Sequence, residues 1–141
     1  MADKLNQVAI RMIEQPPLLS KEPMDSPEAA IRVMQEFLSE MDRELFCIVN
    51  LQSDLKPINM NIVSVGALNQ SLTHPREVFK SAILSNAAGI LMIHNHPSGN
   101  LAPSKEDIYI TDRLRQAGEP LGIPLFDHTI TGREKEYFSF Q

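Results

Sequence analysis

The sequence predicts a single α/β domain in which helices flank a mixed β-sheet. Two β-prone runs, residues 44–51 and 58–65, are separated by a short turn, which indicates an antiparallel hairpin. A third run, residues 87–93, is apolar without a break and is typical of a strand buried on both faces. Segments with helical spacing lie between the strand-like runs. Because some strands are paired and others alternate with helices, we expect a mixed sheet rather than strict βαβ repetition.

Composition favours one domain with a substantial core. The chain has 141 residues, of which 43% are hydrophobic. No segment approaches the roughly 20 apolar residues of a membrane span, and the first four residues (Met1-Ala2-Asp3-Lys4) lack the apolar stretch of a signal peptide. We therefore expect a soluble, cytoplasmic protein without a membrane partner.

Charge and cysteine content exclude several classes of function. The net charge of −5 argues against general affinity for nucleic acid, which needs clustered Lys and Arg. The single cysteine, Cys47, excludes an internal disulfide and a multi-cysteine zinc site. Since Cys47 lies in an apolar run, we expect a core residue rather than a nucleophile.

The first 25 residues are predicted to precede the domain proper. Residues 7–12 alternate in polarity and favour a strand, and residues 15–25 form a proline-rich arm. Ser26-Pro27-Glu28 then has the pattern of a helix start, and apolar residues recur at helical spacing to about Met41. The domain is accordingly assigned to residues 26–141.

Further elements follow the hairpin. A helix is expected to begin at His74, with Val78, Phe79, Ala82 and Ile83 on its buried face. The central strand is expected over residues 87–94.

The C-terminal part is predicted to contain one long helix and two strands. Ser104 begins the helix, which is expected to end near Ala117 because Gly118 and Pro120 follow. The strands are expected at residues 125–131 and 137–140, with Gly132 in the turn between them.

The end of the central strand carries His94-Asn95-His96. Side chains alternate along a strand, so His94 and His96 project to the same side and offer two imidazole ligands. On the following helix, Asp107 heads the stripe that includes Ile110 and Leu114, which otherwise packs on the core. Because catalytic zinc takes three protein ligands and one water, Asp107 is the candidate third ligand.

Simpler explanations exist for each of these residues alone. Ser104-x-x-Asp107 is also the pattern of a capping box, which starts many helices without a metal. A histidine in a turn is often only a hydrogen-bonding residue. Two histidines on one side together with an inward acid make the joint case for a metal site stronger, and Ser104 can serve both the cap and the site.

Hydrolysis at such a site needs a group that carries a proton. Spacing alone does not choose among the available acids, which are Glu36, Glu40, Asp42, Glu44 and Glu106. Glu44 is attractive because it begins a probable central strand, where an acid has no packing role. The alternative for Glu44 is a solvated acid at a strand end.

The motif resembles a known signature. His94-x-His96, then seven residues from Pro97 to Pro103, then Ser104-x-x-Asp107 resembles the JAMM signature of JAB/MPN-domain metalloproteases. Three blocks more closely resemble the RadC family of bacterial JAB-domain proteins: His94-Asn95-His96-Pro97-Ser98-Gly99, Pro75-Arg76-Glu77-Val78-Phe79 and Asp127-His128. The resemblance spans roughly residues 26–141.

The resemblance implies a zinc metallopeptidase or isopeptidase that cleaves an amide bond. His94, His96 and Asp107 match the ligands of one zinc ion, Ser104 matches the serine that stabilises the oxyanion, and Glu44 matches the general acid/base. The implied fold is a curved mixed sheet flanked by helices, akin to cytidine deaminase. Deaminase chemistry is not expected, because the chain lacks the His-x-Glu and Pro-Cys-x-x-Cys elements.

Other residues and functions remain open at this stage. His128 is expected to be a core histidine sharing a strand face with Phe126, with second-shell support of a ligand as the alternative. Ser98 is a candidate substrate contact. A non-catalytic module linked to DNA repair or mobile elements is the alternative function, although the charge does not support DNA binding, and residues 1–25 lack the helix-hairpin-helix pattern of longer RadC proteins. A scaffold protein that forms homodimers is the third possible function.

Overall fold

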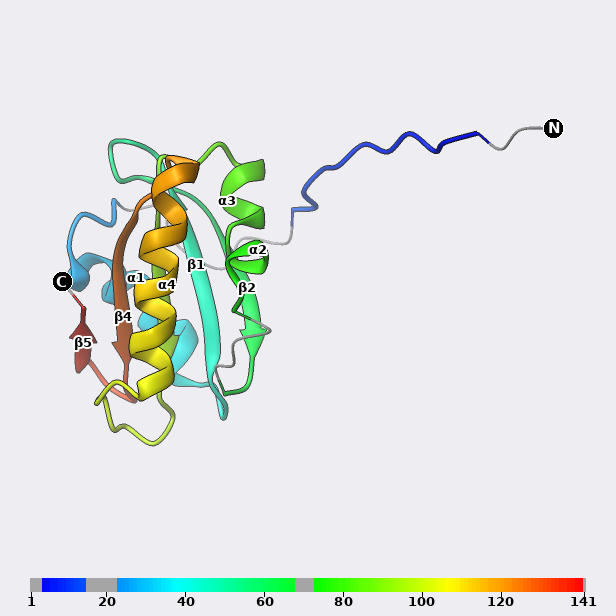
Figure 1. Ribbon diagram of the computed structural model, residues 1–141. Coiled ribbons are helices and arrows are strands. Elements are labelled where there is room, and N and C mark those ends of the chain that lie inside the picture. The colour runs from blue at the N-terminus through cyan, green and yellow to red at the C-terminus, as the bar shows by residue number, and fades with distance from the viewer. Residues whose placement is uncertain (1–3, 15–22, 68–72, 141) are drawn as a thin grey trace.

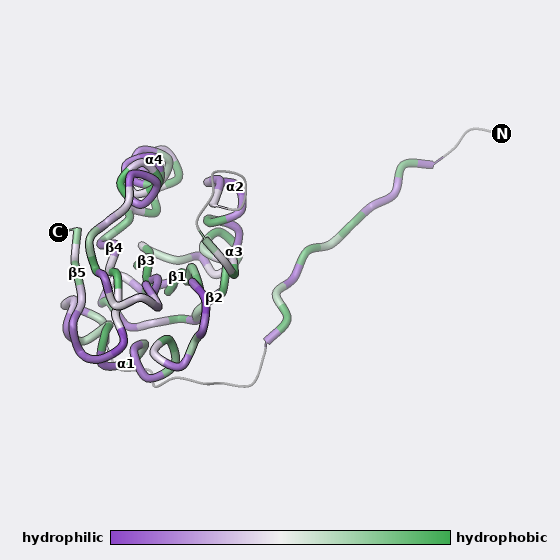
Figure 2. The backbone as a smooth tube through the Cα atoms, turned by 90° about the horizontal axis from the view of Figure 1, so that it is seen from below, coloured by the Kyte–Doolittle hydropathy of each residue, from purple (hydrophilic) through white to green (hydrophobic). Residues whose placement is uncertain are grey.

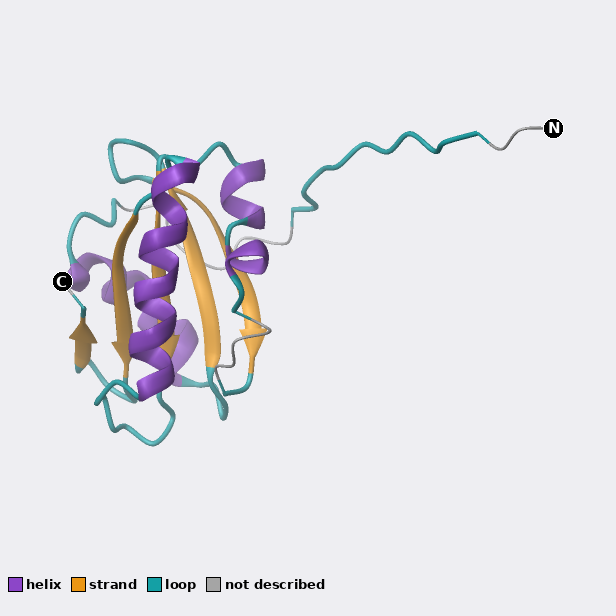
Figure 3. Ribbon diagram, viewed as in Figure 1, coloured by secondary structure: helices purple, strands orange, loops and turns teal. Residues whose placement is uncertain are grey.

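The computed structural model describes residues 4–14, 23–67 and 73–140. Its centre is a five-stranded sheet in the order β2-β1-β3-β4-β5 (Figures 1 and 3). The strands are β1 (Leu45–Leu51), β2 (Pro57–Val65), β3 (Gly89–Asn95), β4 (Leu125–Thr131) and β5 (Tyr137–Ser139).

The sheet is mixed, as the sequence predicts. Strand β1 pairs antiparallel with both β2 and β3. Strand β3 pairs in parallel with β4, which pairs antiparallel with β5. The expected hairpin and the mixed sheet with flanking helices are therefore confirmed, and β3, which carries the two histidines, lies in the middle of the sheet.

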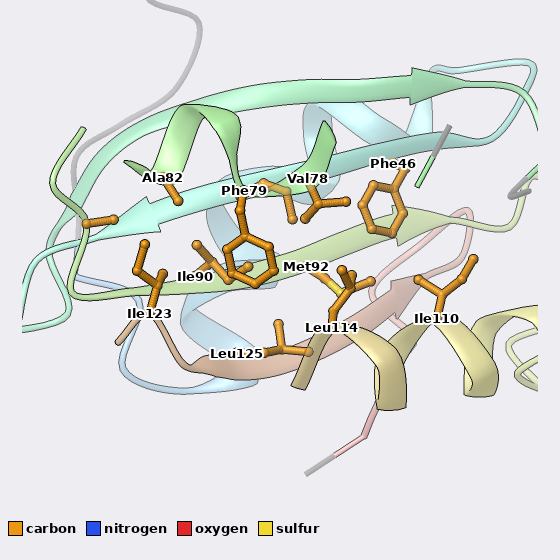
Figure 4. Close-up of a cluster of buried hydrophobic side chains, with 12 residues drawn as sticks. Phe46, Val78, Phe79, Ala82, Ile90, Met92, Ile110, Leu114, Ile123 and Leu125 are labelled. Atoms are coloured by element: carbon orange, nitrogen blue, oxygen red, sulfur yellow. The ribbon is translucent and has the colours of Figure 1, made fainter. Parts of the chain in front are cut away.

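Helices cover both faces of the sheet, as the tube in Figure 2 shows. Helix α1 (Pro27–Ser39) lies on one face, and α2 (Pro75–Val78), α3 (Lys80–Leu84) and α4 (Lys105–Leu121) lie on the other. Alternate residues of the central strands contribute side chains to two hydrophobic clusters, one on each face of the sheet. Phe46 and Met92 pack in the cluster beneath α2, α3 and α4 (Figure 4), whereas Cys47 and Ile93 pack against α1.

Two serines begin the helices that the sequence predicts. The Ser26 hydroxyl accepts a hydrogen bond from the backbone N–H of Ala29 at 3.1 Å, and Ser104 accepts one from the N–H of Asp107 at 3.0 Å. Each bond satisfies a backbone donor that has no partner within its helix. The starts of α1 and α4 are thus set by local sequence.

Helix α4 is longer than expected. It continues through Gly118 and Pro120 to Leu121, and it is capped by Gly122, whose φ of 69° is left-handed. A glycine adopts this conformation without steric cost, and the N–H of Ile123 then bonds to the carbonyl of Gly118. Pro120 lies in the last turn, one residue before the helix ends at Leu121. The expected end near Ala117 is therefore wrong.

The helix expected at His74 is two short helices. Phe79 closes α2 and opens α3, and it is buried together with Val78 and Ala82. Ile83, by contrast, is 52% exposed. The prediction for Ile83 is therefore wrong.

Strand β4 contains an irregularity that changes which face its side chains occupy. Ile90 pairs with Leu125, but the next residue, Leu91, pairs with Asp127, so Phe126 is skipped. Phe126 packs against the α1-side cluster. His128 pairs with Met92 and shares the opposite face. The prediction that His128 and Phe126 share a face is wrong, since the skipped residue reverses the alternation.

The N-terminal residues 4–14 extend away from the domain (Figure 1) and are exposed. They are neither helix nor strand, so the strand expected at residues 7–12 is not formed there. The core of the proline-rich arm, residues 15–22, lies outside the described residues. Among the helices described, none has the length and apolar character required to cross a membrane.

Candidate metal centre

His94 and His96 lie together where β3 ends. His94 is fully buried and His96 is 9% exposed. Their side chains share the α4 side of the sheet, as strand alternation requires, and their Nε2 atoms lie 3.0 Å apart. The pair of imidazoles predicted from His94-x-His96 is therefore present in the fold.

Asp107 approaches the same point from the first turn of α4. Its Oδ1 lies 3.3 Å from Nε2 of His94, and its Oδ2 lies 3.3 Å from Nε2 of His96. Oδ2 also accepts a hydrogen bond from the N–H of Ser104 at 2.7 Å, which completes a capping box. The cap and the histidine contacts coexist, because capping holds the carboxylate in place beside the imidazoles.

The spacing of these atoms fits one metal ion. The ligand atoms of His94, His96 and Asp107 all lie within 4.8 Å of one another. Ligands about 2.0–2.1 Å from a tetrahedral ion are separated by about 3.3 Å, close to the 3.0 and 3.3 Å observed. His96 Nδ1 is 2.7 Å from the carbonyl of Asn100, which makes it the N–H donor and leaves Nε2 with a lone pair. The three residues could therefore hold a metal ion.

The charges at the centre are strongly coupled. Burial opposes ionisation of Asp107, but the adjacent imidazoles of His94 and His96 prevail and hold the pKa of its carboxyl well below the usual range. The pKa of His96 is raised, chiefly by its hydrogen bond with Asp107 and against the effect of burial. Asp107 is therefore ionised at neutral pH and favours a cation between the two rings.

Glu44 lies next to His96 and is more exposed than the three candidate ligands. Because Phe46 pairs with His94 across antiparallel strands, the residue two positions before Phe46 faces the residue two positions after His94. Glu44 Oε1 is accordingly 3.8 Å from Nε2 of His96, and the Glu44 side chain is 28% exposed. The antiparallel register of β1 and β3 therefore explains why Glu44, one of the acids considered from the sequence, lies beside His96.

Three further residues join the site, and two of them were not predicted. His128 Nε2 lies 2.7 Å from Nδ1 of His94, and the Thr111 hydroxyl lies 2.5 Å from Nδ1 of His128. Burial, followed by the charge of His94, lowers the pKa of His128 well below its usual value. Phe140 stacks on the His128 ring with centroids 4.5 Å apart. Thr111 could have been found from its position four residues after Asp107 on one helix face.

Ser98 lies in the loop after β3 and Cys47 lies in the core, and the substrate contact expected of Ser98 stays a prediction. Ser98 is exposed, and its hydroxyl accepts a bond from the N–H of Asn100 at 3.2 Å, which shapes the loop after the histidines. Cys47 is fully buried on the α1 side, and burial raises its pKa to about 12. A thiol in that state is a poor nucleophile, consistent with the core position expected for Cys47.

Fold and site together define a class of protein. A mixed sheet whose central strand ends in His-x-His, with an aspartate arriving from the next helix, is the arrangement of a JAB domain with a JAMM-type metal site. The chain belongs to the RadC family, because the model of the RadC-like JAB domain matches residues 24–141.

Relatives support this membership. The chain is 46% identical over 120 residues to a UPF0758 protein of Thermotoga maritima, covering 85% of this chain and 53% of the relative. It is 42% identical over 118 residues to one of Desulfitobacterium hafniense, covering 84% and 52%, and 41% identical over 112 residues to one of Methanosarcina mazei, covering 79% and 49%. The chain thus spans about half the length of these curated relatives.

Proposed function

We propose that this domain is a zinc-dependent hydrolase of the JAMM type that cleaves a peptide or isopeptide amide bond. The observation that carries the proposal is the convergence of Glu44 on the group formed by His94, His96 and Asp107. A zinc ion held by those three residues would polarise the amide carbonyl and lower the pKa of a bound water to about 7. Imidazole nitrogen and carboxylate oxygen are ligands that zinc accepts.

Glu44 is proposed to move the proton. Its carboxylate takes a proton from the attacking water as the new C–O bond forms, and delivers it to the amine nitrogen as the C–N bond breaks. The distance of 3.8 Å from Glu44 Oε1 to Nε2 of His96 supports this role, and the Glu44 side chain is partly exposed to solvent. Both steps use one proton, so Glu44 returns to its starting state.

Ser104 is proposed to stabilise the oxyanion. Its hydroxyl oxygen accepts the N–H of Asp107, which leaves the hydroxyl proton available as a donor. Ser104 is exposed at the start of α4, beside the metal ligand Asp107. In comparable sites, one hydrogen-bond donor directed at the developing negative charge lowers the barrier of acyl transfer by roughly 3–4 kcal/mol.

Metal analysis tests the first half of the proposal. Protein purified at neutral pH is expected to contain one zinc ion per chain, and His94→Ala is expected to lose it. Mass spectrometry of the intact protein under non-denaturing conditions and elemental analysis both measure this stoichiometry. Protein without zinc, or a zinc content unchanged by His94→Ala, would refute the metal site.

Turnover tests the second half. Glu44→Gln is expected to retain zinc and to lose cleavage of amide-linked peptides in an unbiased substrate screen, by about 100-fold or more. Glu106→Gln is the matched control, because Glu106 is an exposed acid on the first turn of α4 next to Asp107. Full activity of Glu44→Gln would show that the assigned general base is wrong.

A further inference from the structure

We propose that His128 and Thr111 form a proton-ordered chain that fixes the tautomer of His94, so that its Nε2 presents a lone pair to the metal position. The inference rests on the metal-binding part of the proposed function and does not depend on the reaction. It assigns His128 and Thr111 as positioning residues, which act through His94 rather than on a substrate.

The proton-ordered chain is a continuous series of short contacts between buried groups. Nδ1 of His94 lies 2.7 Å from Nε2 of His128, and Nδ1 of His128 lies 2.5 Å from the hydroxyl of Thr111. That hydroxyl lies 2.6 Å from the carbonyl oxygen of Asp107. Each of the four residues is at most 2% exposed. The series therefore starts at one metal ligand and ends at the backbone of another.

The order of the protons follows from the last contact. A carbonyl oxygen can only accept, so two oxygens 2.6 Å apart require the hydroxyl proton of Thr111 to point at Asp107. With its proton used, the Thr111 oxygen accepts from Nδ1–H of His128. Nε2 of His128 is then the acceptor for Nδ1–H of His94. Nε2 of His94 is left with its lone pair, as metal ligation requires.

The opposite order is incompatible with the geometry. If Thr111 donated to His128, the oxygens of Thr111 and Asp107 would face each other at 2.6 Å without a proton. Nε2 of His94 would also carry a proton and point it at the metal position. The structure thus supports one direction for the whole chain.

Other contacts hold the middle of the chain in place. The ring of Phe140 stacks on His128 with an angle of 2° between the planes, and the N–H of Phe140 donates to the carbonyl of His128 at 3.0 Å. The irregularity in β4 turns His128 toward His94 instead of toward α1. Two features of the C-terminal strands therefore orient this one imidazole.

His96 offers a useful comparison, because its tautomer is fixed by a different partner. Its Nδ1 lies 2.7 Å from the carbonyl of Asn100, in the loop after β3. Loss of the His128 chain should therefore change the tautomer of His94 and leave that of His96 unchanged. Partners of this kind alter metal affinity by about 10- to 100-fold in other sites.

The test uses the whole 141-residue protein and does not require a substrate. ¹⁵N–¹H correlation spectra of the imidazoles in metal-free protein report the tautomer of each histidine, and competition with a chromophoric chelator reports the affinity for Zn²⁺. Wild type is expected to show His94 protonated at Nδ1. Thr111→Val is expected to give a mixed or reversed His94 tautomer and about 10-fold or greater loss of zinc affinity, whereas Thr111→Ser is expected to restore both.

Thr129→Val is the matched control. Thr129 is as buried as Thr111, and its hydroxyl also donates a hydrogen bond, to Asp127. It is expected to leave the tautomer and the zinc affinity unchanged. His128→Gln, whose side-chain oxygen can accept from His94, should retain more zinc affinity than His128→Phe, which keeps the stacked ring and loses the acceptor.

Two results would overturn the proposal. One is a His94 protonated at Nε2 in folded, metal-free wild type. The other is equal zinc affinity for Thr111→Val and Thr129→Val. Zinc binding with the expected tautomer but without amide cleavage would instead refute the proposed reaction and leave this inference standing.

Discussion

Asn95 holds the backbone on both sides of Glu44. Its side-chain oxygen accepts the N–H of Leu45 at 2.7 Å, and its side-chain nitrogen donates to the carbonyl of Arg43 at 3.0 Å. Asn95 is 2% exposed and stands between His94 and His96 on β3. The residue that separates the two candidate ligands therefore also positions the candidate acid, from the opposite face of the strand.

Asn95→Ala should destabilise the protein and disturb Glu44 more than the metal site. Truncation leaves the N–H of Leu45 and the carbonyl of Arg43 without their partner, which costs about 1–3 kcal/mol of unfolding free energy. Urea unfolding of metal-free protein measures this cost. Zinc content should stay near one per chain, while amide turnover should fall.

Asn100→Ala is the control for this variant. The Asn100 side chain is exposed and accepts one backbone bond, from Ala102, while its backbone carbonyl still serves His96. We expect it to cost less than 1 kcal/mol, roughly the value of one exposed hydrogen bond. Equal destabilisation by the two substitutions would contradict the role assigned to Asn95.

Local patterns were enough to predict much of this molecule. The starts of α1 and α4 depend on Ser26 and Ser104, whose hydroxyls bond to backbone three residues away. The shared side of His94 and His96 follows from strand alternation alone. These features require no knowledge of distant segments, so the sequence was sufficient to expect them.

Features that depend on pairing between distant segments were not predictable in the same way. The place of Glu44 follows from the register of Phe46 with His94, which no local pattern encodes. The face of His128 depends on one residue skipped in the pairing of β4 with β3. Alternation within residues 125–131 gave the wrong face for this reason.

The close approach of Gly118 to the backbone after α4 provides a further test of the fold. Gly118→Ala would stabilise a helix by about 1 kcal/mol on propensity alone. In this fold the added Cβ would lie 2.4 Å from the backbone oxygen of Ile123, which cannot move without shifting the turn into β4. We therefore expect a net loss of about 1–3 kcal/mol.

Thermal or urea unfolding of Gly118→Ala measures the sign of this effect. Gln116→Ala, at an exposed position of the same helix, serves as the control and should change stability by less than about 0.5 kcal/mol. A more stable Gly118→Ala variant would show that the turn after α4 relaxes freely.

Protons should compete with zinc for His96, so the affinity for zinc should already depend on pH at values above the usual imidazole pKa. The hydrogen bond with Asp107 raises the pKa of His96 in the metal-free protein, so His96 gains a proton at a higher pH than a free imidazole, for which the pKa is about 6.5. Zinc must displace this proton. Because the pKa of Asp107 is lowered, its carboxylate adds no proton near neutral pH.

Zinc affinity is therefore expected to fall by at least about tenfold per pH unit below the raised pKa of His96. Stability of the metal-free protein should respond to His96 in the opposite sense. A raised pKa in the folded state stabilises the fold fully below about pH 6.5, and this contribution is lost as pH rises through the folded-state value. Chelator competition and urea unfolding between pH 5.5 and 8, roughly one unit either side of the imidazole range, measure the two effects. A zinc affinity that stays constant from pH 8 to about 6.5 would contradict the coupling between His96 and Asp107.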